Sequence, residues 1–272
     1  MIDLHCHMLP GIDDGARDLD TALAMARIAV DDGIRVTACT PHIYPGLYEN
    51  TADGIRQAIE TFRAELQAAD IPLEITIGAD IQLVPELMEG LHAGWMPTVH
   101  QSRYFLFEPP HHVVPARFSE SVFDTLAAGY VPLITHPERL TWLDEDHYDW
   151  FVDAARQGAW IQVTSGALTG RFGKRPKYWA EKFTGEGLVH ILATDAHNTK
   201  NRPPLLAEGR EAAAQLVGEA EAELLVEGRT RHILENGEPG RLPMPPGLQP
   251  GASSSSARKA KQKSWFGRLF GS

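Results

Sequence analysis

Short hydrophobic runs alternate with segments of helical hydrophobic pattern along most of this 272-residue chain. Seven runs have the residue types of β-strands, at residues 2–6, 34–40, 73–80, 104–108, 131–136, 160–165 and 189–195. Between them, LDTALAMARIAV is a clear helix that Asp18 or Asp20 can cap and Gly33 can end. Further helices are predicted at residues 52–69, 118–128 and 146–157. The alternation predicts an α/β fold built on a parallel sheet or barrel.

Histidine or acidic residues stand at the ends of almost all the predicted strands. Six of the seven runs end this way, with His5 and His7, His42, Asp80, Glu108, His136, and Asp195 followed by His197. The sixth run ends instead in Thr164-Ser165. In barrels of alternating strands and helices, the functional site lies where the strands end. We therefore expect these side chains to converge on one site.

The opening segment MIDLHCHMLPGIDDG contains both a cysteine and a histidine pair. Residues i and i+2 of a strand face the same side, so His5 and His7 can share a metal while Cys6 faces away. Cysteine-dependent tyrosine phosphatases need an arginine after a spacing of five residues, to hold the phosphate. Ile12 occupies that position after Cys6, and the second cysteine also has no arginine at that spacing. We expect Cys6 to be a packing residue.

The candidate ligands are imidazoles and carboxylates, without a thiolate. Such donors suit manganese, iron, zinc or magnesium. With one aspartate of the DDG segment added, there are nine of them: His5, His7, Asp14, His42, Asp80, Glu108, His136, Asp195 and His197. Nine ligands are too many for one ion, so we expect two or three divalent ions that share bridging carboxylates.

The bulk composition is that of a globular protein with an acidic body. The net charge is −11, and five basic residues lie beyond residue 250, where there are no acidic ones. An acidic body argues against a nucleic-acid surface. Two cysteines indicate no disulfide framework, and we find neither a signal peptide nor an apolar run of the roughly 18 residues that a membrane helix needs. We expect a cytoplasmic protein.

The C-terminal part differs from the rest in composition. We expect a barrel domain at residues 1–242, a Pro/Gly/Ser-rich flexible linker at 243–257 and a basic-aromatic tail at 258–272. The tail sequence RKAKQKSWFGRLFGS combines basic and aromatic side chains, which suits contact with an anionic membrane surface. A solvated tail without a partner is the alternative.

Several motifs occur together in a fixed order: HCH, DDG, PH, GAD, SRYFLFE, THPER and TDAHN followed by NRPP. Over roughly residues 1–240 this combination resembles the PHP (polymerase and histidinol phosphatase) superfamily, and within it the bacterial CpsB/YwqE-type tyrosine phosphatases of capsule and exopolysaccharide systems. The resemblance implies a distorted (β/α)7 barrel with a trinuclear site, in which manganese is the leading candidate. It also implies three ligand sets: His5, His7, Asp80 and Asp195; Asp80, Glu108 and His136; Asp14, His42 and His197.

One position departs from the family pattern, because relatives usually carry glutamate where this chain has Asp80. The shorter side chain could bridge two metals less well. Two arginines, Arg139 in HPER and Arg202 in NRPP, are candidates for holding phosphate, since a guanidinium matches phosphate oxygens with two hydrogen bonds. A metal-activated hydroxide would attack phosphorus.

The resemblance implies a substrate and a partner that the residues alone do not identify. The substrate would be phosphotyrosine on a membrane-bound tyrosine autokinase that regulates capsule or exopolysaccharide synthesis. Two alternatives stay open: another PHP phosphoesterase, such as a histidinol-phosphate phosphatase, or a catalytically weak PHP-fold regulatory module.

Overall fold

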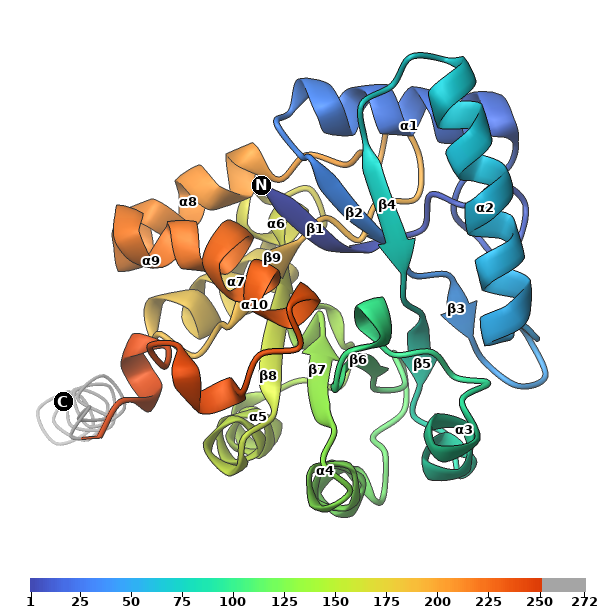
Figure 1. The fold of residues 1–272 in the computed structure, drawn as a ribbon. Helices are drawn as coiled ribbons and strands as arrows, with labels where there is room; N and C mark the ends of the chain where they lie inside the picture. The colour runs from blue at the N-terminus through green and yellow to red at the C-terminus, as the bar shows by residue number, and fades with distance from the viewer. Residues whose placement is uncertain (251–272) are drawn as a thin grey trace, which may run out of the picture.

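Parallel pairing links the strands into two sheets (Figure 1). The computed structural model describes residues 1–250, so the predicted tail and the end of the predicted linker lie outside the described residues. One sheet has the order β1-β2-β4, and the other has the order β3-β5-β6-β7-β8-β9. The bounds are β1 Ile2–Cys6, β2 Val36–Cys39, β3 His42–Ile43, β4 Glu74–Ile77, β5 Asp80–Gln82, β6 Tyr104–Glu108, β7 Val131–Thr135, β8 Trp160–Thr164 and β9 Ile191–Ala193.

The two sheets close into one barrel. β2 leads into β3, and β4 leads into β5, across short breaks. On the other side, β1 meets β9 through a parallel bridge between Cys6 and Ala196, where the His7 amide donates to the Ala196 carbonyl at 2.9 Å. Beside this bridge, the buried Asp3 carboxylate accepts hydrogen bonds from the amide and hydroxyl of Thr194. The strands thus occupy seven positions around the barrel, and the predicted distorted (β/α)7 barrel is confirmed.

The strand predicted at 73–80 is divided into β4 and β5, and a short further strand, β3, follows the strand predicted at 34–40 after a break. β2 ends at Cys39 and β3 begins at His42; Pro41, between them, has no amide hydrogen to donate, although its carbonyl accepts the Asp80 amide at 3.1 Å. Between β4 and β5, a Cβ on Gly78 would lie 2.8 Å from Thr40 Cγ2, which shows how closely the two segments approach at the break. Asp80 therefore begins β5 instead of ending the third strand, and it pairs in register with His42.

The predicted helices are present, with Asp18 as the N-cap of the first, where its carboxylate accepts the Thr21 amide. Most helices lie on the outside of the barrel (Figure 1). The described helices are α1 Leu19–Asp31, α2 Ala52–Ala68, α3 Leu87–Ala93, α4 Phe118–Ala127, α5 Glu145–Gln157, α6 Ser165–Leu168, α7 Lys174–Gly185, α8 Ala207–Val217, α9 Glu219–Glu223 and α10 Arg229–Leu234. Within residues 1–250, none is both long and apolar enough to cross a membrane.

The apolar core leaves one end of the barrel for polar groups. A large cluster lies between the strands and the outer helices, and a smaller one includes Tyr104, Leu133, Trp160 and Ile191 near the strand starts. Because strand side chains alternate, Glu108 lies on the same side of β6 as Tyr104, but at the strand's C-terminal end. The candidate site thus lies above a packed apolar layer.

The first residues of the predicted linker are held against the barrel. The Arg229 guanidinium donates to the Pro243 carbonyl at 3.1 Å, and the Gly247 amide donates to the Gly187 carbonyl at 2.9 Å. A Cβ on Gly247 would lie 2.0 Å from the Glu186 carbonyl oxygen, so only glycine fits there without movement. The segment up to Gly247 is therefore part of the packed body.

Candidate metal centre

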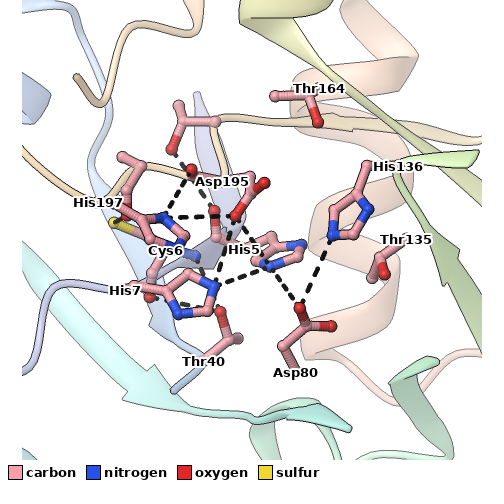
Figure 2. Close-up of polar contacts among 12 residues, drawn as sticks. His5, Cys6, His7, Thr40, Asp80, Thr135, His136, Thr164, Asp195 and His197 are labelled. Carbon is pink, nitrogen blue, oxygen red and sulfur yellow. Dashed lines mark hydrogen bonds and ion pairs between the residues drawn. The ribbon is translucent and has the colours of Figure 1, made fainter. Parts of the chain in front are cut away.

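All nine predicted ligand residues come together at the C-terminal ends of the strands. Their nitrogen and oxygen atoms form overlapping groups in which the ligand atoms lie within 4.8 Å of one another. Figure 2 shows His5, His7, Asp80, His136, Asp195 and His197 pointing toward a common space. The groups are His7, Asp14, His42 and His197; His5, His7 and Asp80; His5, His136 and Asp195; and His42, Asp80 and Glu108.

His5 and His7 direct their Nε2 atoms to one point, 3.2 Å apart. Each Nε2 lies 3.4 Å from Asp195 Oδ1. The opposite ring nitrogens are held from behind, His5 Nδ1 by Gln162 Oε1 at 2.8 Å and His7 Nδ1 by Asp13 Oδ2 at 2.7 Å. Both imidazoles can therefore present an Nε2 lone pair to the same cation.

Cys6 points away from this space, as the strand alternation predicted (Figure 2). Its side chain is fully buried in the outer apolar cluster together with Cys39. Burial raises the pKa of the Cys6 thiol well above its usual value. A buried thiol with a raised pKa is a poor nucleophile, so its interpretation as a packing residue is confirmed.

Asp80 lies between the histidines of three neighbouring segments. Its Oδ2 is 3.3 Å from His5 Nε2, 3.5 Å from His42 Nδ1 and 3.8 Å from His136 Nε2. Glu108 approaches the same two outer histidines, with distances of 3.3 Å to His42 Nδ1 and 3.8 Å to His136 Nε2. Although it is shorter than glutamate, the Asp80 side chain thus faces ligand candidates on both sides.

Asp14 forms the outer edge of the cluster. Its Oδ1 is 3.5 Å from His42 Nε2 and 3.3 Å from His197 Nε2. The Asp14 side chain is 47% exposed, whereas His197 is buried, so this group opens toward solvent. Tyr48 stacks on the His42 ring with a centroid distance of 5.4 Å, which limits the orientations of that imidazole.

Both predicted arginines lie beside Asp195. Arg139 and Arg202 each form an ion pair with Asp195 Oδ2, while Oδ1 faces the histidines. Phe172 lies against both guanidinium groups, with its ring centroid 4.5 Å from Arg139 Cζ and 5.8 Å from Arg202 Cζ. Burial alone would raise the pKa of the Asp195 carboxyl, but the two arginines keep it well below its usual range. Asp195 thus links the metal-facing groups to the arginines.

The electrostatics of the cluster favour a bound cation. Burial lowers the pKa of His5, but Asp80 and Asp195 outweigh it and raise that pKa to about 9. Burial also lowers the pKa of His42, but Glu108 and other nearby carboxylates outweigh it and raise that pKa to about 10. Protons on these imidazoles would offset the buried negative charge, and a divalent cation held by the same groups would supply that positive charge instead.

The hydrogen bonding gives a separate test of the fit. Both Asp80 carboxylate oxygens and His197 Nε2 are buried, and none makes a hydrogen bond of good geometry with a described residue. His5 Nε2 lies 3.3 Å from Asp80 Oδ2, and Asp14 Oδ1 lies 3.3 Å from His197 Nε2, but neither pair is aligned for a hydrogen bond. Buried polar atoms are rarely left without a partner, because desolvation costs free energy. Carboxylate oxygens and imidazole nitrogens that converge without partners fit divalent cations.

Comparison with known proteins agrees with this geometry. The family model for capsular polysaccharide synthesis proteins, CpsB/CapC, matches residues 1–235. The chain belongs to the CpsB/CapC family. Two relatives in this family are tyrosine-protein phosphatases by name. YwqE of Bacillus subtilis is 38% identical over 203 residues, covering 74% of this chain and 79% of YwqE. CpsB of Streptococcus agalactiae is 26% identical over 245 residues, covering 87% and 99%.

Solved structures confirm the PHP-type fold of this CpsB/CapC chain. One structure from work on YwqE of Bacillus subtilis and CpsB of Streptococcus pneumoniae superposes with a TM-score of 0.81 at 33% identity, covering 88% of this chain and 96% of that chain. Those two proteins are described as metal-dependent tyrosine phosphatases. A β-aspartyl dipeptidase of Fervidobacterium islandicum, with a TM-score of 0.50 and 13% identity, shares the fold alone.

The sequence of this CpsB/CapC chain had not pointed to three residues of the site. Asp13 is the first aspartate of the DDG segment, of which only the second was chosen as a ligand. Gln162 lies in β8, the one strand whose end lacked a strong ligand, and its side chain contacts His5 inside the barrel. Alternate residues of a strand face the same side, so counting back from Thr164 could have identified Gln162. Phe172 follows α6 in a loop, and the sequence holds no signal for its place beside the arginines.

Proposed function

We propose that this CpsB/CapC protein hydrolyses phosphotyrosine in proteins with the help of bound divalent cations. The observation that carries the proposal is the convergence of nine His, Asp and Glu side chains on one face, beside two arginines. The names of the relatives YwqE and CpsB, tyrosine-protein phosphatases, support the same activity.

The ligand groups support a centre of two or three ions. The first ion would take His5, His7, Asp80 and Asp195, the second would share Asp80 and take Glu108 and His136, and the third would take Asp14, His42 and His197. The overlap of the groups around Asp80 and His7 supports such sharing. Manganese is our first choice, on the resemblance to PHP phosphatases, and iron, zinc and magnesium suit the same donors.

The chain's own residues would orient the phosphoryl group. Divalent ions held here supply Lewis acidity and an acidified water. Arg139 and Arg202 approach the site from one side, so their guanidinium groups can hold the phosphoryl oxygens that the ions leave free. A tyrosine leaving group, with a pKa of about 10, needs less protonation than an alkoxide.

Metal removal tests this function directly. Treatment of the full-length protein with a chelator is expected to abolish hydrolysis of a phosphotyrosine peptide, and manganese is expected to restore it. The same protein is expected to turn over histidinol phosphate much more slowly than the peptide. Activity that survives complete metal removal, or a preference for histidinol phosphate, would contradict the proposal. Less than one bound ion per chain, with no activity in added manganese, would indicate a regulatory module.

The physiological partner belongs to the same proposal. We propose that the substrate is the phosphotyrosine of a membrane-bound tyrosine autokinase in capsule or exopolysaccharide synthesis, which the family's description supports. We also propose a cytoplasmic protein whose barrel is followed by the linker and the tail, and whose tail contacts the inner membrane surface. The basic residues at 258–263 and the aromatic residues after them support that contact.

Vesicle binding tests the role of the tail. The full-length protein is expected to cosediment with anionic vesicles, and a chain ending at residue 250 is expected to stay in the supernatant. Both are expected to hydrolyse a small aryl phosphate at the same rate, because Pro243 and Gly247 still contact the body in the shortened chain. Equal vesicle binding by the two proteins would rule the contact out.

A further inference from the structure

Asp13 contacts three parts of the metal centre without being one of its candidate ligands. Its Oδ2 lies 2.7 Å from His7 Nδ1 and accepts the backbone amide of His42 at 3.1 Å. Its Oδ1 accepts the amide of Gly15 at 2.9 Å. The side chain is only 1% exposed, so solvent does not compete for these oxygens. One buried carboxylate therefore joins the end of β1, the start of β3 and its own loop.

The contact with His7 determines which ring nitrogen faces the metal space. A carboxylate can only accept a hydrogen bond, so His7 Nδ1 carries the proton. His7 Nε2 is then the free donor atom, and it lies 3.2 Å from His5 Nε2 and 3.4 Å from Asp195 Oδ1. Carboxylates in this position fix the tautomer of a metal-binding imidazole and raise its basicity.

The backbone contacts of Asp13 hold a second group of ligand candidates. Asp14 follows directly in the chain and faces His42 and His197. The loop packs tightly against β1, since a Cβ on Gly15 would lie 2.1 Å from the His7 carbonyl oxygen. Because Asp13 accepts the amides of both His42 and Gly15, it fixes the position of Asp14 relative to His42.

We propose that Asp13 is a positioning residue that prepares two neighbouring metal positions at once. It presents His7 Nε2 to the buried ion, and it holds the loop so that Asp14 meets His42 and His197. The corresponding support of the His5 ring is a neutral amide, Gln162, whereas the His7 ring is held by the carboxylate of Asp13. The inference rests on the proposed metal centre, but not on the identity of the phosphoester substrate.

The variant Asp13→Asn removes this role while it keeps the shape of the side chain. An amide has one acceptor oxygen, so it cannot accept from His7, His42 and Gly15 in the arrangement that the carboxylate allows. We expect the affinity of the metal-free protein for Mn²⁺, measured by titration calorimetry, to fall about 10- to 100-fold. Asp18→Asn is the matched control, because Asp18 follows Asp13 by five residues in the chain and caps α1, and its side chain bonds to Thr21 and Arg17 instead of the metal cluster.

The control variant separates positioning from the loss of one charge in this part of the chain. Asp18→Asn is expected to leave both the Mn²⁺ affinity and the melting temperature of the metal-free protein close to wild type, since asparagine caps a helix about as well as aspartate. Equal Mn²⁺ affinities of Asp13→Asn and wild type would overturn the proposal. In the Co²⁺-loaded protein, the visible spectrum of Asp13→Asn is expected to differ from that of wild type, and an identical spectrum would also count against it.

A measurement on the unaltered protein tests the proposal even if the Asp13→Asn variant does not fold. Nitrogen-15 NMR of labelled histidines in the metal-free protein, with His7 assigned by its absence in His7→Gln, reports which ring nitrogen carries the proton. We expect the Nδ1–H form for His7 when the ring is neutral. Observation of the Nε2–H form would overturn the proposal whether or not the protein is a phosphatase, so the two hypotheses can fail separately.

Discussion

Replacement of Asp80 by alanine is expected to lower kcat/KM for a phosphotyrosine peptide by about 10³-fold. Asp80 Oδ2 lies within 3.3–3.8 Å of His5, His42 and His136, so its loss removes the carboxylate shared by two proposed ions. Metal ions contribute several kcal/mol of charge stabilisation to phosphoryl chemistry, and each 1.36 kcal/mol is tenfold in rate. Elemental analysis of the purified variant is expected to show fewer bound ions than wild type.

Three further variants make the Asp80 result specific. Asp80→Asn is expected to lose nearly as much activity as Asp80→Ala, because the amide keeps the shape but not the charge. Asp80→Glu is expected to stay within about tenfold of wild type, which corresponds to about 1.4 kcal/mol, because glutamate keeps the carboxylate and the family resemblance implies glutamate at this position. Cys6→Ser is expected to keep wild-type turnover per folded molecule. Full activity of Asp80→Ala, or loss in Cys6→Ser with an intact fold, would refute the metal mechanism.

The site residues at the ends of the strands were predictable because two simple rules apply to them. A parallel barrel brings the C-terminal ends of all its strands to one face, and histidines or acids at those ends are visible in the sequence. The two-residue period of a strand predicted that His5 and His7 face the site together. The same period predicted that Cys6, between them, faces the opposite side. These rules need no knowledge of the tertiary contacts of any single side chain.

The interruptions of the barrel and the support behind the ligands were not predictable in this way. Gly78 lies in the break between β4 and β5, although the hydrophobic run at 73–80 passes through it without a change, and the short strand β3 lies beyond the run predicted at 34–40. The contact of His5 with Gln162 joins residues 157 positions apart, so it depends on how β1 and β8 are placed in the closed barrel. Phe172 reaches the arginines from a loop whose path no local pattern encodes.

The same contacts suggest that ligands and arginines work as one unit through Asp195. One of its oxygens faces the histidine pair, and the other receives both guanidinium groups. The arginines therefore stay close to the metal space before any phosphate arrives. Phe172 restricts them further, because a guanidinium packs favourably over an aromatic face.

Replacement of Arg139 by alanine is expected to lower kcat/KM for the phosphotyrosine peptide by about 10²- to 10³-fold, the usual loss for a donor that stabilises transition-state charge. Arg139→Lys is expected to recover little of it, because an ammonium cannot make the paired hydrogen bonds of a guanidinium. The inhibition constant of inorganic phosphate is expected to rise in both variants. Bound metal is expected to stay near the wild-type level, since Arg202 still neutralises Asp195.

Arg171 provides the matched control for this experiment. It precedes Phe172 in the same loop, but its guanidinium pairs with Glu208 instead of Asp195. Arg171→Ala is therefore expected to leave kcat/KM within about twofold of wild type, as surface substitutions usually have small effects. If Arg139→Ala lost bound metal in proportion to its activity, the arginine would act through Asp195 on the metal centre, and its proposed contact with phosphate would be wrong.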